Sequence, residues 1–575
     1  MDAFDRLRKN LKKDFSGRFP VRLFLLGDTA TQWLAQALRG TGYEHGLDLQ
    51  VREAGFNQIG QQVFDTGSEL YASEPQVILI YHSTQKLLET YNRLDAASRA
   101  DLAADRIGFV GRLLDALRRR STAPVIYFNY PESDDGVFGS FSNKVGSSFL
   151  YQLRKLNVDL MQFAAAREGF YIGDLAAVQL RVGRPAFYRP SVYVNTEMEI
   201  DLAALPAVAA ATVAQVGALF GRIRKCLILD LDNTLWGGVI GDDGLGQIQI
   251  GTPGIGKAFT EFQHWIRKLR QRGIVLAVCS KNSEATARQP FEEHPDMVLR
   301  LADIAVFIAN WENKVDNIRE IRSILRIGYD SMVLLDDNPF EREMVRAALP
   351  DILVPELPGD PADFLEYLAP LHLFETASLT SADADRTAQY RTEQERNEER
   401  LAYTDEASYL EGLGMRSEVE PFSRHNAPRV AQLAQRSNQF NLRTVRYTEA
   451  ELLQLAGTEG VLTFSFTLTD RFGDNGLIAA VVLKPAAAGE LFIDNWLMSC
   501  RVLRRGMEHF VLNTIATRAR ERGFRTLRGE YVATAKNELV RDHYRSLGFG
   551  EQAGHWVLDL EGFRPSPTPV RGNDN

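Results

Sequence analysis

The chain has 575 residues, 45% of them hydrophobic and 25% charged, which is the composition of a soluble globular protein too long for one hydrophobic core. We expect roughly three or four domains. The formal net charge of −9 excludes a global positive field, so we expect neither nucleic acid nor an anionic membrane as a partner.

The cysteines and the N-terminus indicate a reducing compartment. Only Cys226, Cys279 and Cys500 occur, far apart and without metal-ligand spacing, and residues 1–15 lack the apolar stretch of a secretory signal. The most apolar segment, 201–223, is rich in alanine and interrupted by proline, which favours a packed helix over a membrane span. We therefore expect a cytoplasmic protein.

Residues 1–215 alternate apolar strands with helical patterns. The predicted elements are strands at 21–28, 75–82 and 123–131 and helices at 29–38 and 106–120. This rhythm is typical of a parallel sheet wrapped by helices, so the first domain is predicted to be α/β.

A second α/β domain is predicted for residues 222–375. Its strands are expected at 226–232, 274–280, 304–309 and 331–337. The polar, charge-dense stretch 376–410 that follows predicts a solvated linker helix.

Residues 411–562 have a different pattern. Successive strands are expected at 460–470, 476–484 and 490–499, followed by a helix at 506–523. This predicts a mixed α+β domain with mainly antiparallel strands at its centre. The tail, 563–575, has the proline-rich and polar composition of a disordered end.

Two carboxylates, Asp230 and Asp232, follow the first strand of the second domain. They are two residues apart, so they project from the same face at the carboxyl end of that strand, where open parallel sheets bind ligands. Two unpaired carboxylates there would repel each other and raise one pKa. A divalent cation removes the conflict, and hard oxygen ligands suit Mg²⁺.

Polar residues end three further strands of the same domain. Ser280 and Asn282 follow the second strand, Lys314 comes after the third, and Asp336 and Asp337 follow the fourth. Each alone is commonly a helix cap, a turn residue or a solvated charge. Their occurrence in order at successive strand ends favours a catalytic site.

This series resembles the motifs of the haloacid dehalogenase superfamily, which has a Rossmann-like α/β fold and transfers phosphoryl groups through an aspartyl-phosphate. The resemblance implies that Asp230 is the nucleophile and Asp232 the general acid/base. It also implies that Ser280 and Lys314 orient phosphate and nucleophile. The expected ligands of Mg²⁺ are Asp230 and Asp336, with Asp232 and Asp337 as further candidates.

The stretches "DLDNTLWGGVIGDDG" and "DDNPFERE" resemble the FkbH-like branch, subclass IIIC of that superfamily. Members act in polyketide assembly: they take a glyceryl unit from 1,3-bisphosphoglycerate, remove phosphate and deliver a glyceryl thioester to an acyl carrier protein. The resemblance implies an enzyme of the glyceryl-acyl carrier protein synthase type. No large insertion separates the first two motifs, so we expect an open site that admits a group carried on a protein arm.

The third domain also contains FkbH-like stretches, "RSNQFNLRTVRYTEAEL", "LTDRFGDNGLI" and "WLMSCRVLRRGME". Within them "RVLRRG" resembles the R-x-x-G-x-G turn by which Gcn5-type acyltransferases hold pyrophosphate on a helix N-terminus. The resemblance implies that Arg501, Arg504, Arg505 and Gly506 bind the phosphopantetheine arm of the carrier protein. Arg504 replaces the first glycine, which puts tight binding of coenzyme A in doubt.

Other residues of this domain are candidates for thioester chemistry. Tyr544 occupies the position of a sulfur-facing phenol in the same family, or is a buried core tyrosine. Cys500, beside Arg501, is a candidate acyl carrier or a small core residue. Cys226 and Cys279 are expected to pack in strands. The candidate substrate contacts, which a glycine-rich hairpin also explains, are Asp470, Arg471 and Asp474.

The first domain resembles SGNH-type esterases of flavodoxin-type fold at "LLGDTATQ", with Thr29 in the place of the nucleophilic serine. The last block of that family is replaced by a stretch with Asp174 and no histidine, and His82 is more simply a strand-end residue. Without a base a threonine hydroxyl is a poor nucleophile. We expect a degenerate, non-hydrolytic docking module for the carrier protein or for a homodimer.

Three alternatives to the glyceryltransferase stay open. They are a phosphatase of a small phosphomonoester, an acetyltransferase with a regulatory phosphatase domain, and a non-catalytic assembly protein that binds carrier domains. The sequence names neither the pathway nor the carrier protein.

Overall fold

The computed structural model describes residues 3–251, 253–379, 405–437, 439–499, 502–534 and 537–572. The chain divides into two compact units, Met1–Leu219 and Phe220–Asn575. Most of the predicted linker helix at 376–410 falls on residues 380–404, which lie outside the described residues. Among the residues that are described, no helix has both the length and the apolar character to cross a bilayer.

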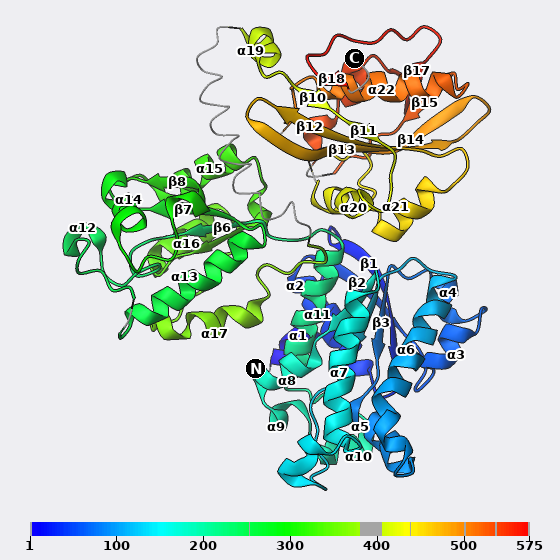
Figure 1. The fold of residues 1–575 in the computed structure, drawn as a ribbon, viewed down its shortest axis with the longest axis vertical. Helices are drawn as coiled ribbons and strands as arrows, with labels where there is room; N and C mark the ends of the chain where they lie inside the picture. Colours follow the sequence, from blue (N-terminus) through cyan, green and yellow to red (C-terminus); the bar gives the residue numbers. More distant parts are fainter. Residues whose placement is uncertain are drawn as a thin grey trace. The chain divides into compact units, whose positions relative to one another are not determined.

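The first unit is built on a parallel sheet in the order β2-β1-β3-β4-β5 (Figure 1). Its strands are β1 (Phe19–Gly27), β2 (Leu47–Glu53), β3 (Val77–Tyr81), β4 (Val125–Phe128) and β5 (Phe170–Gly173). Central β3 is buried along its whole length, which explains its uninterrupted apolar sequence. The predicted α/β fold of this part of the chain is confirmed.

Helices cover this sheet in two groups. In one group α1 (Ala3–Asn10), α2 (Gln32–Glu44) and α11 (Leu205–Leu219) contact one another. In the other α6 (Leu102–Arg118) packs with α3 (Ile59–Phe64) and α7 (Phe149–Ala165). The remaining helices are α4 (Glu69–Ala72), α5 (Thr84–Arg93), α8 (Leu175–Val182), α9 (Arg184–Phe187) and α10 (Pro190–Thr196).

The second sheet is parallel, in the order β8-β7-β6-β9. Its strands are β6 (Cys226–Leu229), β7 (Val275–Ser280), β8 (Ile304–Ala309) and β9 (Met332–Leu335). Its helices are α12 (Ile240–Asp243), α13 (Gly256–Gln271), α14 (Glu284–Glu293), α15 (Lys314–Leu325), α16 (Pro339–Ala348) and α17 (Phe364–Leu368).

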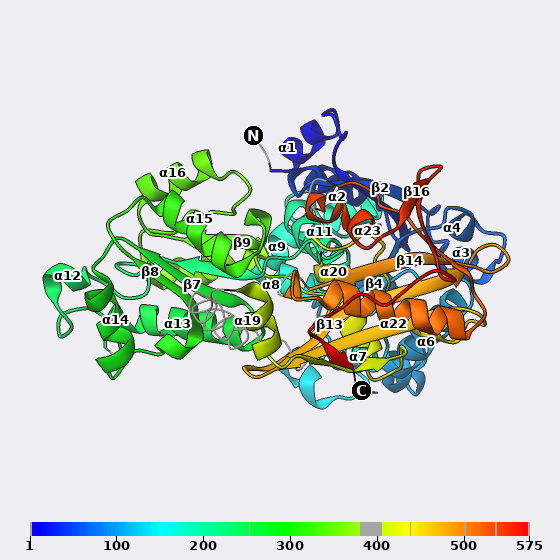
Figure 2. The same cartoon turned by 90° about the horizontal axis from the view of Figure 1, so that it is seen from above.

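Both faces of the second sheet are buried. Figure 2 shows α13 and α14 on one side of it and α15 and α16 on the other. Leu227 and Leu229 pack on the first side, whereas Cys226 and Ile228 pack on the second. Cys279 belongs to the same core as Cys226, as expected for cysteines that only pack. Two-sided burial requires continuous apolar strands, which is why polar residues are confined to the strand ends.

The third sheet is mixed, in the order β16-β17-β15-β14-β13-β12-β10-β18, with β11 paired to β12. Its strands are β10 (Arg416–Ser417), β11 (Val419–Glu420), β12 (Leu462–Asp470), β13 (Gly473–Pro485), β14 (Glu490–Met498), β15 (Thr526–Gly529), β16 (Gly550–Gln552), β17 (His555–Asp559) and β18 (Arg571–Gly572). Central strands β12, β13 and β14 are antiparallel, so the predicted α+β fold is confirmed.

The helices of this domain lie on both faces of its sheet. They are α19 (Glu406–Gly412), α20 (Ala427–Arg436), α21 (Glu449–Ala456), α22 (Met507–Glu521) and α23 (His543–Ser546). In Figure 1, α22 lies on one face and α20 with α21 on the other. Because α22 crosses over the sheet, β14 and β15 pair in parallel.

The prediction of a disordered tail is wrong for residues 563–572. Asn513 of α22 exchanges two hydrogen bonds with the backbone of Ser566, and β18 pairs with β10. Composition suggested disorder because the segment is rich in proline. Its backbone nevertheless finds partners on α22, at Ser566, and at the sheet edge, where Arg571 N donates to Met415 O.

Polar groups at the carboxyl edge of the first sheet are engaged internally. The Thr29 hydroxyl donates to the carbonyl of Glu197, and Asp174 caps α8 by accepting from Ala177 N at 3.0 Å. His82 Nδ1 lies 2.9 Å from the Tyr127 hydroxyl. Thr29 and His82 are thus held in different contacts.

Two acidic side chains are buried at this edge. Asp28 accepts from Ser83 N at 2.8 Å, and Glu199 accepts from the Tyr81 hydroxyl at 2.6 Å. Burial raises the pKa of each carboxyl to about 7. For both carboxyl groups, the pKa in the folded protein exceeds the value near 4 of the unfolded chain. The stability that the folded protein gains from holding these protons is therefore complete below about pH 4 and is lost as pH rises through about 7.

We predict that Glu199→Gln reduces the loss of stability of the first unit between pH 5 and pH 8, because glutamine keeps the acceptor for Tyr81 without the ionisation. The urea midpoint of this unit, followed by pulse proteolysis at both pH values, measures the effect. Glu69→Gln, at the start of α4, is the control and should leave the pH dependence as in the wild type. An equal pH dependence in Glu199→Gln and wild type would contradict the assignment.

Candidate active site

The carboxyl ends of the strands of the second sheet form the candidate site. Asp230 directly follows β6, Ser280 ends β7, Lys314 begins α15 after β8, and Asp336 directly follows β9. Because the strands are parallel, their carboxyl ends meet at one edge. Each of these side chains is at least nine-tenths buried.

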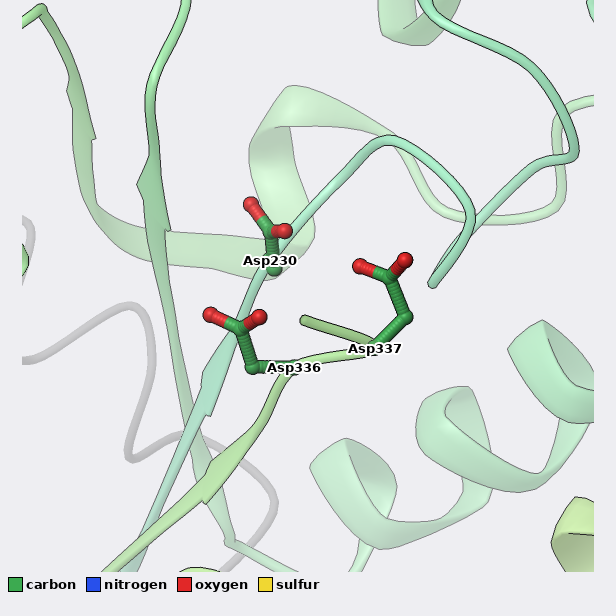
Figure 3. A group of neighbouring side chains, drawn as sticks. All are labelled: Asp230, Asp336 and Asp337. Atoms are coloured by element: carbon green, nitrogen blue, oxygen red, sulfur yellow. The ribbon is translucent and has the colours of Figure 1, made fainter. Parts of the chain in front are cut away.

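Three carboxylates gather at this edge. Figure 3 shows Asp230 from the end of β6 opposite Asp336 and Asp337 from the end of β9. One oxygen of each lies within 4.8 Å of the others, and Asp336 is fully buried. Closely spaced oxygens from three carboxylates are a donor set that suits a hard divalent cation.

One ammonium group contacts two of the carboxylates. Lys314 Nζ lies 3.1 Å from Asp230 Oδ1 and 2.5 Å from Asp336 Oδ2. Although burial lowers the pKa of Lys314, the charges of Asp230 and Asp336 outweigh it and raise that pKa. With all four groups ionised the cluster carries a net charge of −2, which a divalent cation would neutralise.

The carboxyl groups reflect this excess of negative charge. Burial, and then the charge of Asp230, raise the pKa of Asp336 to about 6, although Lys314 opposes the shift. The same two causes raise the pKa of Asp337. Asp336 therefore takes up a proton at a higher pH than an isolated aspartate does, and a bound cation would offset the cause of this shift. The residues present thus fit Mg²⁺.

Asp232 is not part of the acidic cluster. Its Oδ1 accepts from Trp236 Nε1 at 2.9 Å and from Ile240 N at 3.0 Å, and its Oδ2 accepts from Asn282 Nδ2 at 2.7 Å. The expectation that the Asp232 carboxylate binds the metal is therefore corrected, because its oxygens face donors instead. Burial still raises its pKa, which suits a group that gives and takes a proton.

Several residues that hold the site were not predicted. The guanidinium of Arg342, on α16, donates to the carbonyl oxygens of Asp336 and Asp337 at 2.8 and 2.7 Å. Asp337 N donates to Thr234 Oγ1 at 3.2 Å, which ties the loop after β9 to the loop after β6. Arg342 is buried in a helix that follows the Asp pair, and a buried arginine beside an acidic motif is the signal that could have identified it.

The loop after Asp232 folds back onto the core. Leu235, Trp236 and Ile240 are buried, and Gly238 adopts a φ of +92° that disfavours a side chain. Its amide donates to Asn233 Oδ1 at 3.0 Å. The loop thus places the Trp236 indole and the Ile240 amide where they fix Asp232.

The candidate turn of the third domain lies between β14 and α22. Gly506, at a φ of +82°, is the N-cap of α22, and Arg504 has a φ of +62°, which costs about 1–2 kcal/mol for a residue other than glycine. Arg505 is buried and forms an ion pair with Asp470 at 3.6 Å. The two side chains thus face each other, and the roles of Arg505 as a phosphopantetheine ligand and of Asp470 as a substrate contact stay predictions.

The other predicted residues of this domain differ in placement. Asp474 accepts from Gly476 N at 2.7 Å within the hairpin, and Arg471 is exposed. Tyr544 is buried and its hydroxyl has no hydrogen-bond partner in the described part of the chain. Cys500 and Arg501 lie outside the described residues.

Comparisons with known proteins agree with these findings. Residues 22–216 match the family described as FkbH, N-terminal domain. The solved N-terminal part of BF1531 from Bacteroides fragilis, described as containing a phosphatase domain complexed with Mg, is 51% identical. The match covers 66% of this chain and 100% of that one, with a TM-score of 0.63. A search of curated proteins found no match.

The C-terminal part has more distant structural matches. The ribosomal-protein-S18-alanine N-acetyltransferase from Escherichia coli is 19% identical, covers 25% of this chain and 94% of its own, and has a TM-score of 0.20. The GNAT domain of S. lividans PAT is 18% identical, covers 24% and 89%, and has the same score.

The fold and site define an α/β protein with a phosphatase domain. The chain belongs to the FkbH family, as the motifs predicted. This membership indicates an enzyme with an FkbH-like phosphatase role.

We predict that Lys314→Met lowers the melting temperature by several degrees in a chelator, because removing the ammonium group leaves buried carboxylates uncompensated at a cost of about 3–5 kcal/mol. Calorimetry in EDTA measures the loss, and Lys257→Met, at an exposed position of α13, is the control. A melting temperature of Lys314→Met equal to that of the wild type would show that the ammonium group does not offset the carboxylates.

Proposed function

We propose that the protein loads a glyceryl-derived C3 unit from 1,3-bisphosphoglycerate, or a related phosphorylated C3 acid, onto the phosphopantetheine thiol of an acyl carrier protein. Phosphate is removed in the same sequence of reactions, and the product enters polyketide-type biosynthesis. The observation that best supports this proposal is a buried cluster in a chain of the FkbH family, made up of Asp230, Lys314, Asp336 and Asp337.

The phosphate step uses the edge of the second sheet. Asp230 would attack phosphorus as the bond to the substrate oxygen breaks, and Asp232 would give its proton to that oxygen. Asp232 then takes a proton from the water that hydrolyses the aspartyl-phosphate. The raised pKa of Asp232 and its fixed position support this role. Lys314 holds Asp230, and Ser280 would donate to a phosphoryl oxygen.

The residues that would hold Mg²⁺ are Asp230, Asp336 and Asp337. When bound, the cation would neutralise charge on the phosphoryl oxygens. The Bacteroides relative, described as complexed with Mg, supports this choice of cation.

The thioester step is assigned to the third domain. Gly506, the N-cap of α22, provides no side-chain cap, so backbone N–H groups at the start of this helix would bind the phosphate of the carrier arm, whereas Arg504 N donates to Glu508 Oε1 at 2.8 Å. Cys500 is proposed as the thiol that first accepts the acyl group, on its sequence position beside this turn. A homodimer and a docking role for the first domain remain part of the proposal.

A phosphatase of a small phosphomonoester is the second candidate function. The observation that favours it is the description of the Bacteroides relative as containing a phosphatase domain. The two functions differ in whether an acyl group reaches a carrier thiol.

We predict that holo acyl carrier protein gains the mass of one glyceryl group when it is incubated with this protein, Mg²⁺ and 1,3-bisphosphoglycerate. Asp230→Asn should lower release of the phosphomonoester phosphate by about three orders of magnitude, because the nucleophile is lost, whereas the phosphate that leaves as the acyl group passes to the thiol does not depend on Asp230. Intact-mass spectrometry and a phosphate assay measure both quantities. Asp242→Asn, at an exposed position of α12, is the control.

The outcomes separate the candidates. Phosphate release without an adduct would support the phosphatase alone. No release of the phosphomonoester phosphate by the wild type, or equal release of it by Asp230→Asn, would contradict both functions and leave a carrier-binding assembly protein.

A further inference from the structure

Three neighbouring side chains of the third domain have buried polar atoms without hydrogen-bond partners. They are Trp496 Nε1, His543 Nε2 and Tyr544 Oη, and partners are lacking among the described residues. The exposed fractions of the three residues are 0%, 7% and 1%. A buried polar atom without a partner lowers the stability of the folded protein, so a group of three requires an explanation.

The three rings form one cluster. The centroid of His543 lies 4.6 Å from that of Trp496 and 5.8 Å from that of Tyr544, and the Trp496 and Tyr544 centroids are 6.4 Å apart. Phe440 packs edge-on against His543 at 4.7 Å. The cluster therefore combines three polar atoms with a largely apolar environment, in which a hydrogen bond to a ligand is strong.

The cluster lies where β14 and β15 part. The two strands pair only from Glu490 to Phe492 of β14, whereas Trp496 lies further along that strand. The Tyr544 hydroxyl reaches the end of β15, since a Cβ added at Gly529 would lie 2.7 Å from it. Further along β14, where it no longer pairs with β15, Met498 N donates a hydrogen bond to Phe440 O at 3.2 Å. β14 also leads into the turn before α22.

The three side chains can all act as donors without bringing charge. Trp496 donates only, and the Tyr544 hydroxyl donates at neutral pH because burial raises its pKa. Burial, and then the charge of His509, lower the pKa of His543 to about 3, so its imidazole is neutral. In the tautomer with hydrogen on Nε2 it donates as well. Each of the three atoms can therefore be satisfied by an acceptor on a ligand.

We propose that Trp496, His543 and Tyr544 bind the carbonyl oxygen of an acyl group while it passes to a thiol, with His543 and Trp496 as catalytic residues of this step. The inference rests on the proposed acyl transfer and assigns it a site. A carbonyl oxygen becomes an anion in the tetrahedral intermediate, and fixed donors in a dry site stabilise that anion more than the ground state.

The step balances as an acyl transfer from an acyl phosphate. The thiol sulfur forms a bond to the carbonyl carbon, and the carbonyl electron pair moves onto oxygen, where the donors meet it. When the carbonyl re-forms, the C–O bond to phosphate breaks and phosphate leaves with that electron pair. The thiol proton ends on phosphate, and no redox partner is needed.

The variants His543→Phe and Trp496→Phe test the assignment. Each removes one donor and keeps an aromatic ring. We expect kcat for carrier loading to fall about 10²–10³-fold with little change in KM. The melting temperature should stay equal or rise, since a buried unpaired polar atom is removed. His555→Phe is the matched control, because His555 of β17 also has an unpartnered Nδ1 but is not part of the cluster.

Binding is tested separately with S-glyceryl pantetheine as probe. We expect the ¹H–¹⁵N indole resonance that Trp496→Phe eliminates to shift downfield when the probe is added to wild-type protein. No shift, wild-type loading by both variants, or an equal loss in His555→Phe would overturn the inference. If the wild type loads no carrier, the proposed function fails, and the indole shift still decides whether this cluster binds a thioester.

Discussion

The structure of the candidate site depends on placing three carboxylates beside one ammonium group in a buried sheet edge. Asp230, Asp336 and Asp337 bring three negative charges and Lys314 one positive charge, and little water screens them. Burial and the charge of Asp230 raise the pKa of Asp336, because one ammonium group does not offset three carboxylates. The Arg342 guanidinium places a positive charge at the backbone carbonyl oxygens of Asp336 and Asp337. The proposed cation would offset the negative charge at the carboxylate oxygens. The same excess of negative charge would stabilise a bound cation.

Much of this arrangement could be predicted from the sequence. The strands of the first and second sheets are continuous apolar runs because both faces are buried, and their ends are marked by polar residues. Parallel pairing then brings Asp230, Lys314 and Asp336 to one edge whatever the detailed packing. The family resemblance, carried by the residues around Asp230 and Asp336, was confirmed by the match to the Bacteroides protein.

Side-chain directions could not be predicted, because they depend on residues distant in sequence. Asp232 turns from the cation site toward Asn282, which belongs to the next strand end, and toward a loop folded by Trp236. Arg505 meets Asp470 across the third domain instead of facing solvent. The proline-rich tail is ordered because α22 and β10 offer it partners, which composition does not reveal. The unpartnered atoms of Trp496 and His543 have no sequence signal, since tryptophan and histidine are ordinary core residues.

The central claim is that the acidic cluster binds a divalent cation, and Mn²⁺ as an anomalous scatterer tests it most directly. The account predicts one anomalous peak in crystals grown with Mn²⁺, in contact with oxygens of Asp230, Asp336 and Asp337, and loss of that peak in Asp336→Asn. A peak coordinated by the Asp232 carboxylate, or none at this edge of the sheet, would contradict it.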